Sequence, residues 1–139
     1  MTTYDALPTE YSALIRRALT DLEACENDSR YTIDMGAAWH VWNGNGFWVC
    51  LVGAVAAKSL GYESRDPIGG IWAFPQQYQS RLSFLEKVQH RGTGALSAET
   101  EDSLPEEYQD LRVTRYSENP GQFKADLARI AEGLEKVGL

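Results

Sequence analysis

The side chains of this sequence that could support catalysis are one cysteine and two histidines. Cys50 lies in the apolar run from Phe47 to Ala57, and a thiol near a helix N-terminus can have a lowered pKa because it meets the positive end of the helix dipole. A cysteine hydrolase also needs a histidine as base, and His40 and His90 are the two in the chain. The neighbours of Cys50 are apolar, however, and burial raises a thiol pKa. We therefore predict a core cysteine and no catalytic residue, with a hydrolase built on Cys50 and His40 or His90 as an alternative.

Two other kinds of site have weaker support. Asp34, His40, Cys50 and His90 could supply metal ligands, but no pair has a spacing such as Cys-x-x-Cys or His-x-x-x-His. The glycines of residues 43–46 could turn backbone amides toward a phosphate, but the sequence has neither phosphate-binding glycine motif and no lysine directly follows. We predict no metal and no cofactor.

Two groups of residues are candidates for binding another macromolecule. Three tryptophans lie close together within residues 39–48 and form either core or, if exposed, a binding surface. Residues 98–110 contain six carboxylates and no basic residue, which predicts an exposed and mobile segment. If these carboxylates were fixed in space, they could compete with nucleic acid for a basic protein groove. The candidate binding residues are Trp39, Trp42, Trp48, Glu99, Glu101, Asp102, Glu106 and Glu107.

Composition narrows the classes of partner. The 139 residues suit a single globular domain. A net charge of −7 favours solubility and disfavours direct binding to nucleic acid or anionic membranes. The N-terminal residues 1–5 lack the basic and apolar regions of a secretory signal, and the longest apolar run is about half of the ~20 residues that a membrane span needs. We expect a cytoplasmic protein, with no membrane association, that has a protein as its partner.

Hydrophobic spacing predicts helices over residues 8–25 and 77–90 and a final helix capped by Asn119, with Pro120 in its first position. Residues 31–33 could form a short extended piece. Residues 43–60 allow a hairpin around Asn43–Gly46, or a helix capped by Asn45 that ends at Leu60 before Gly61. We favour the helix because residues 51–57 continue for two turns without a polar side chain.

Together these elements predict a mainly α fold, with α+β as the alternative. Four or more helices should pack around the central apolar helix, and one short β element could lie within residues 31–49. Residues 31–61 should be the buried centre of the domain. Residues 62–77, which include Pro67, Ile68, Trp72 and Phe74, should form an ordered loop packed by its own aromatic side chains.

One part of the sequence resembles an uncharacterised family of small tailed-phage and prophage proteins. The matching pattern is Asp34-Met35-Gly36, then Trp39-His40, then the stretch from Val49 to Gly61 that fits C-L-x-G-A-V-x-A-x-x-L-G. The resemblance extends loosely to residues 81–85 and 120–127. The family often has a second cysteine shortly before the position of Cys50, where this chain has Trp48 and Val49, so a shared metal or redox pair is not implied. The resemblance implies a phage or prophage origin and assigns no activity.

These observations lead to three functional hypotheses. The first is a non-enzymatic phage or prophage accessory protein that binds another macromolecule and inhibits a host or defence protein in the bacterial cytoplasm. The second is the cysteine-dependent hydrolase, and the third is a structural or packaging component of the virion.

Overall fold

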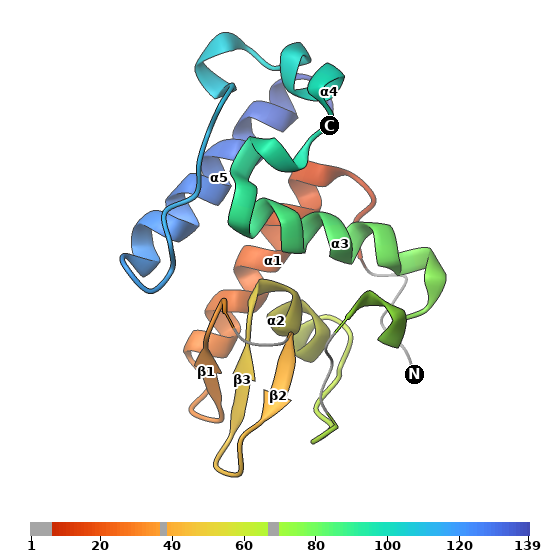
Figure 1. The fold of residues 1–139 in the computed structure, drawn as a ribbon, viewed down its shortest axis with the longest axis vertical. Coiled ribbons are helices and arrows are strands. Elements are labelled where there is room, and N and C mark those ends of the chain that lie inside the picture. The colour runs from red at the N-terminus through yellow and green to blue at the C-terminus, as the bar shows by residue number, and fades with distance from the viewer. Residues whose placement is uncertain (1–6, 37–38, 67–69) are drawn as a thin grey trace.

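The computed structural model describes residues 7–36, 39–66 and 70–139 of the chain (Figure 1). Within these residues the fold is mainly helical, as the sequence predicted, and the short β element expected within residues 31–49 is a small three-stranded sheet. The α-helices are α1 (Tyr11–Glu26), α2 (Leu51–Lys58), α3 (Gln76–Arg91), α4 (Ala98–Ser103) and α5 (Pro120–Lys136). The strands are β1 (Tyr31–Ile33), β2 (His40–Trp42) and β3 (Phe47–Val49), and the short 3-10 turns are η2 (Ile71–Ala73), η3 (Gly92–Ala95) and η4 (Glu106–Tyr108).

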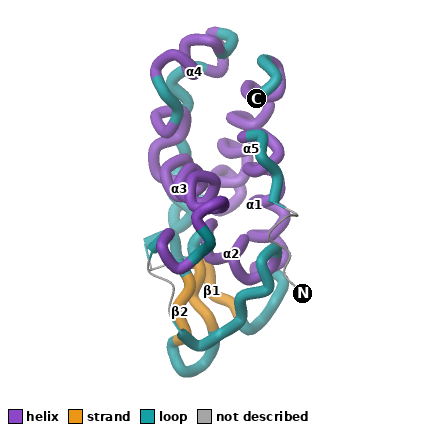
Figure 2. Tube along the Cα trace, turned by 90° about the vertical axis from the view of Figure 1, so that its right-hand side faces the viewer, coloured by secondary structure: helices purple, strands orange, loops and turns teal. Residues whose placement is uncertain are grey.

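The elements form two zones along the length of the molecule. The sheet lies at one end with α2 packed beside it, while α4 and the C-terminal end of α5 lie at the other (Figures 1 and 2). The long helix α1 packs against both α2 and α5 and so connects the zones. The buried apolar side chains of the described residues belong to one hydrophobic cluster, so the two zones share a core.

The long helices form where their apolar spacing predicted them. In α1 the buried face includes Leu14, Ile15, Ala18 and Leu22, which recur at three- and four-residue intervals. In α5 the Asn119 side chain accepts a hydrogen bond from the Gln122 amide at 3.0 Å, the N-cap interaction that the sequence predicted. The predictions of helices at 8–25, at 77–90 and after Asn119 are confirmed.

Helix α2 is the buried centre of the fold. Its residues from Leu51 to Ala57 are all buried, which an all-apolar helix requires. Gly53 is necessary here because a Cβ at that position would lie 1.5 Å from the Trp39 carbonyl oxygen. The absence of a side chain therefore lets the chain entering β2 pass directly over α2.

The prediction of a helix from Asn45 to Leu60 is wrong in its first part, where the hairpin alternative is correct. Residues 47–49 form the central strand, which pairs parallel with β1 and antiparallel with β2. The Asn43 side chain accepts hydrogen bonds from the amides of Asn45 and Gly46, and Gly44 has a φ of +94°. The side-chain bonds fix the turn, and the aromatic and β-branched residues after it suit a strand. Helix α2 therefore begins only after Cys50.

Residues 98–110, predicted to be an exposed and mobile segment, contain the regular elements α4 and η4. Ser97 caps α4 by accepting a hydrogen bond from the Thr100 amide at 3.1 Å, and η4 follows after Pro105. Leu104 and Tyr108 are buried, so two side chains fix this segment to the core, while all of its carboxylates except that of Glu101 are exposed. The periodic analysis missed α4 because this helix has no buried face.

The loop between α2 and α3 is only partly packed by its own aromatics. Phe74 is buried and stacks on Trp39 with ring centroids 6.0 Å apart, whereas Trp72 is 80% exposed. The predicted contributions of Pro67 and Ile68 lie outside the described residues. Among the described helices, none combines the length and the apolar character that crossing a bilayer requires.

Candidate binding cleft

Cys50 is placed in the core rather than in an open site. It is 1% exposed, and burial raises the pKa of its thiol to about 11 despite the opposing effect of backbone hydrogen bonds from Gly53 and Val52. The desolvation of the thiolate thus outweighs the helix N-terminus. A thiolate nucleophile open to substrate, which the hydrolase alternative requires, is not present in this arrangement.

His40 is also buried, and it lies among aromatic rings. Its ring centroid is 4.8 Å from that of Phe47 and 5.1 Å from that of Tyr62. Neither ring nitrogen has a hydrogen-bond partner among the described residues, and burial lowers the pKa of His40. His40 therefore acts here as a packed aromatic side chain, and no hydrogen bond of the described residues joins it to Cys50.

His90 occupies a different environment, in the exposed last turn of α3. Its Nε2 lies 3.0 Å from the side-chain nitrogen of Gln89. An amide nitrogen only donates, so this contact favours the tautomer in which His90 Nε2 accepts. Of the two histidines that the sequence singled out, only His90 faces an open hollow.

The three tryptophans do not form one surface. Trp39 is buried and Trp42 is half-buried, with the Arg65 guanidinium 4.5 Å above its ring. Trp48 is 39% exposed on the outer face of the sheet, because side chains alternate along β3 and its neighbours Phe47 and Val49 take the buried face. Of these three tryptophans, only Trp48 is available on an open surface as a large aromatic contact.

The exposed Trp48 lies in the wall of a cleft of about 860 Å³. Four parts of the chain line this cleft: the outer face of the sheet, the residues after β1, the end of α3, and the segment leading into α5 together with the first turn of that helix. Its apolar lining includes Met35, Trp48, Val113 and Phe123, its charged lining consists of Asp34 and Arg115, and His90 adds a polar ring. The cleft can therefore accept an apolar group beside a polar or charged one.

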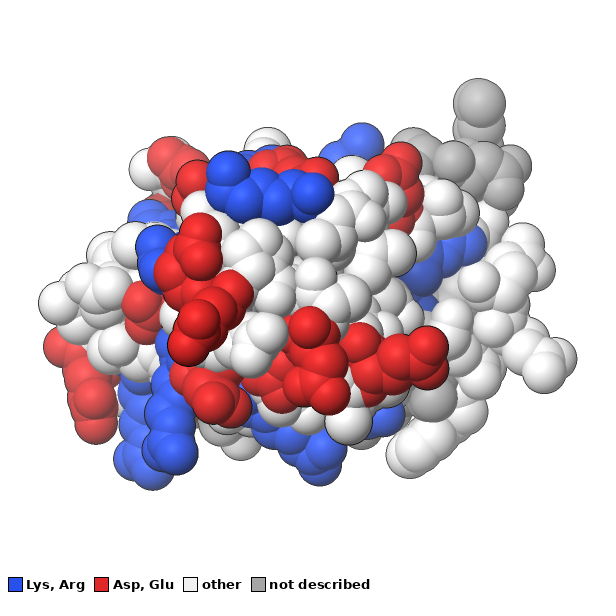
Figure 3. Space-filling model, turned by 90° about the horizontal axis from the view of Figure 1, so that it is seen from above, with Lys and Arg blue, Asp and Glu red and all other residues white. Residues whose placement is uncertain are grey.

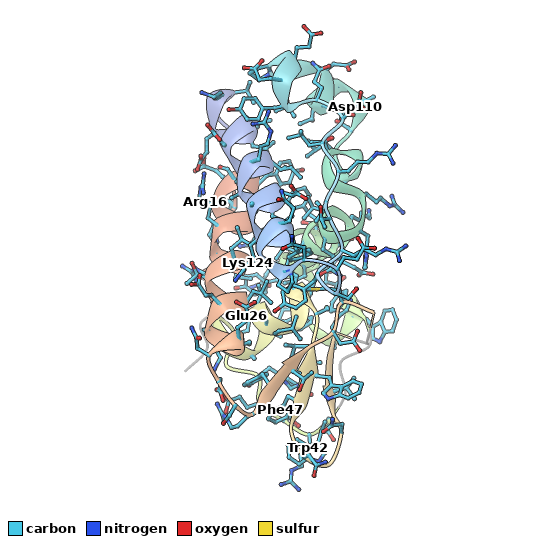
Figure 4. All side chains as sticks on the ribbon, turned by 90° about the vertical axis from the view of Figure 1, so that its left-hand side faces the viewer. Arg16, Glu26, Trp42, Phe47, Asp110 and Lys124 are labelled. Carbon is cyan, nitrogen blue, oxygen red and sulfur yellow. The ribbon has the colours of Figure 1, made fainter. Side chains whose placement is uncertain are left out.

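Specific contacts fix the wall that precedes α5. The Tyr116 hydroxyl donates to Glu26 Oε2 at 2.5 Å, and Lys124 pairs with the other oxygen of the same carboxylate at 2.8 Å. Figure 4 shows Glu26 and Lys124 facing each other where α1 and α5 meet. The Thr114 amide donates to Asp126 at 2.8 Å. These bonds hold residues 113–116 at the cleft without regular secondary structure.

A second hollow of about 740 Å³ adjoins the first. His90 and Val113 line both, so the two hollows meet along the segment 111–115. The second hollow also contains Arg91 and Arg112. No ion pair of the described residues includes Arg91, Arg112 or Arg115, and the two hollows together thus form a groove with three unpaired guanidinium groups.

The sequence reasoning missed these three arginines. The first and the last of them, Arg91 and Arg115, are separated by 24 positions in the sequence. The overall net charge of −7 gives no indication of a local concentration of cations. Arg112 and Arg115 are exposed on either side of the half-buried Val113 and Thr114, an arrangement that no regular hydrophobic period in the sequence predicts.

The acidic candidates lie at the far end of the molecule from the sheet. Glu99, Asp102, Glu106 and Glu107 are exposed, whereas Glu101 is half-buried and accepts hydrogen bonds from the Thr93 hydroxyl and the Asp110 amide. Figure 3 shows carboxylates gathered across this end, with basic side chains at its margins. Four of the five predicted acidic residues thus form a fixed and exposed array that can attract a basic surface.

Among the described residues, no group of three or more His, Cys, Asp and Glu side chains is arranged to hold a metal ion. Comparison of the chain with protein-family models, curated proteins and solved structures found no match.

Proposed function

We propose that this chain is a non-enzymatic accessory protein that acts by binding a protein partner through the groove beside Trp48. The observation that carries the proposal is the position of Trp48, a large aromatic side chain left 39% exposed in the wall of an 860 Å³ cleft. Exposed aromatic residues and unpaired arginines beside a hollow are the residue types that dominate protein interfaces. The phage or prophage origin, and action on a host or defence protein in the bacterial cytoplasm, rest on the sequence resemblance.

A second mode of binding has its own support in the acidic end. Its carboxylates are attached to α4 and η4, which Leu104 and Tyr108 fix to the core. A fixed array could meet a basic surface that normally holds nucleic acid, or could speed the approach of a basic partner. This mode depends strongly on salt, whereas contact through Trp48 does not.

Capture of partners from a bacterial lysate tests the proposal. Immobilised protein should retain a partner at low and at moderate salt, and Trp48→Ser should abolish the retention. Trp72→Ser is the matched control, because Trp72 is more exposed than Trp48 and does not line the cleft. Retention by both variants would exclude the groove as the binding surface, and failure of the wild type to retain any partner would contradict the proposed function.

The acidic mode is separated by a second variant. Replacing Glu99, Glu106 and Glu107 by glutamine and Asp102 by asparagine removes charge but keeps side-chain size. Binding would be assigned to the acidic end if the neutralised variant no longer retained the partner and the wild type released it at moderate salt. In that case Trp48→Ser should still retain the partner.

A further inference from the structure

We infer that the groove binds an extended peptide segment in which an apolar side chain lies beside Trp48 and an acidic side chain lies beside Arg91 and Arg112. This inference rests on the proposed function and specifies the chemistry of the partner. Three features of the groove support it: unpaired backbone groups, unpaired arginines and an apolar hollow next to a polar one.

The backbone of the segment 111–115 is open to pairing. Figure 1 shows this segment as a nearly straight stretch between η4 and the start of α5. The peptide groups of Leu111 bond to Thr93, and the Thr114 amide bonds to Asp126. Among the described residues, no hydrogen bond involves the peptide groups of Arg112 or Val113. Val113 lines both hollows, so an incoming strand that pairs with it would lie along the groove.

The charges of the groove favour an acidic side chain in the second hollow. Arg91 and Arg112 have no carboxylate partner there, whereas Glu101 is already bonded to the Thr93 hydroxyl at 2.6 Å and to the Asp110 amide at 2.9 Å. An acidic group from a ligand would therefore meet free guanidinium donors. Figure 4 shows nitrogen-tipped side chains projecting on this side of the molecule, between Asp110 and the sheet.

The first hollow favours an apolar side chain. Met35, Trp48 and Phe123 supply apolar surface to it, and Trp48 offers an indole ring that needs no rearrangement to be reached. Side chains of an extended peptide alternate in direction, so two residues that enter neighbouring hollows on one side must be two positions apart or a multiple of two. An apolar residue and an acidic residue on one face of the peptide would fill the two hollows together.

The same groove is less suited to single-stranded nucleic acid. Asp34 lies in the first hollow, and Glu101 and Asp110 lie in the second. Three carboxylates beside three arginines give a groove of mixed charge, and a polyphosphate chain needs a mainly positive track. A peptide can match both signs, which favours the peptide.

Binding of short synthetic peptides to the full chain tests the inference. The probe is a fluorescein-labelled peptide in which phenylalanine and glutamate stand two residues apart with serine between them, so that both side chains lie on one face of the extended chain. The comparison peptide has lysine in place of glutamate. By fluorescence anisotropy, the glutamate peptide should bind about tenfold or more tightly than the lysine peptide, as expected for charge pairs in a partly buried groove. Amide NMR shifts should change at Arg112 and Val113.

Variants assign the contacts. Arg112→Glu should weaken binding of the glutamate peptide and strengthen binding of the lysine peptide, and Trp48→Ser should weaken both. Lys136→Glu makes the same charge change in an exposed side chain outside the groove and should alter neither affinity. Equal effects of Arg112→Glu and Lys136→Glu would overturn the assignment.

Three further outcomes separate this inference from its alternatives and from the proposed function. An oligothymidylate probe that binds more tightly than the glutamate peptide, and loses affinity in Arg112→Glu, would overturn the peptide assignment in favour of nucleic acid. If a lysate partner is retained through Trp48 while neither peptide binds, the inference fails and the proposed function stands. If neither a partner nor a peptide binds, both fail.

Discussion

Gln89 of α3 accepts a hydrogen bond from the backbone amide of Leu51, in the first turn of α2, at 3.1 Å. Both residues are buried, so this side chain satisfies a helix N-terminus that water does not reach. The same amide group contacts His90 through its nitrogen, at 3.0 Å. One side chain therefore joins the central helix to the groove.

Gln89→Leu should lower the free energy of unfolding by about 1–3 kcal/mol, because it leaves the Leu51 amide buried without a partner. Chemical denaturation of the purified variant measures this change. Gln76→Leu, at an exposed position at the start of the same helix, should alter stability by less than about 0.5 kcal/mol. Similar losses in both variants would mean that the Leu51 bond contributes little.

Gly133→Ala should displace η4 from α5. A Cβ at Gly133 would lie 2.7 Å from atoms of the Tyr108 side chain, and overpacking of this kind costs about 1–3 kcal/mol. Hydrogen exchange should accelerate in residues 98–110 more than in α1. Gly121→Ala in the exposed first turn of the same helix has its nearest neighbouring atom at 3.6 Å and should be neutral or stabilising. Unchanged exchange in Gly133→Ala would show that Tyr108 is not required to hold the acidic segment.

The helices that the sequence predicted are those with a repeating apolar face. In α1 and α5 the core contacts recur every three or four residues, so local pattern and tertiary packing agree. In contrast, α4 has no buried residue and depends on the Ser97 cap and on its neighbours. A helix of this kind leaves no periodic signal in the sequence.

The sheet and the groove could not be predicted for a related reason. Whether Phe47-Trp48-Val49 continues into the helix or forms a strand depends on β1, which lies 16 residues earlier and supplies the parallel partner for each of the three. The groove combines His90 from α3 with Arg112 and Arg115 from a segment without regular structure. Such juxtapositions follow from tertiary contacts, which spacing along the chain does not encode.

His40 should make the folded state less stable in mild acid. Burial lowers its pKa in the folded protein below the ordinary value of 6.5, so the unfolded chain binds the proton more readily. The stability is therefore complete above about pH 6.5 and falls as the pH decreases from there toward the lowered pKa. Unfolding free energies measured by denaturant across this range should show the loss.

His40→Phe is the matched variant for this test, because it keeps an aromatic ring among Phe47 and Tyr62 and removes two buried nitrogens without partners. Asp21 has the opposite effect: burial raises its pKa to about 6, so its protonation favours the folded state below that pH. The difference between wild type and His40→Phe removes this shared contribution. The difference in unfolding free energy between the two proteins should change across the range from about pH 8 to about pH 5, which spans the ordinary His pKa. A difference that stays constant over this range would contradict the assignment to His40.

Both cysteines should be inert in the folded protein. Cys25 is 0% exposed and Cys50 is 1% exposed, and burial raises the thiol pKa to about 12 for Cys25 and to about 11 for Cys50. The thiolate is the reactive form of cysteine. Both thiols should therefore react rapidly with iodoacetamide at neutral pH only after the protein is unfolded in denaturant. Mass spectrometry measures the extent of alkylation. Cys25→Ala isolates the signal of Cys50. Rapid alkylation of Cys50 in the folded Cys25→Ala variant, with Cys25 protected in the folded Cys50→Ala variant, would reveal an accessible nucleophile and favour the hydrolase over a binding protein.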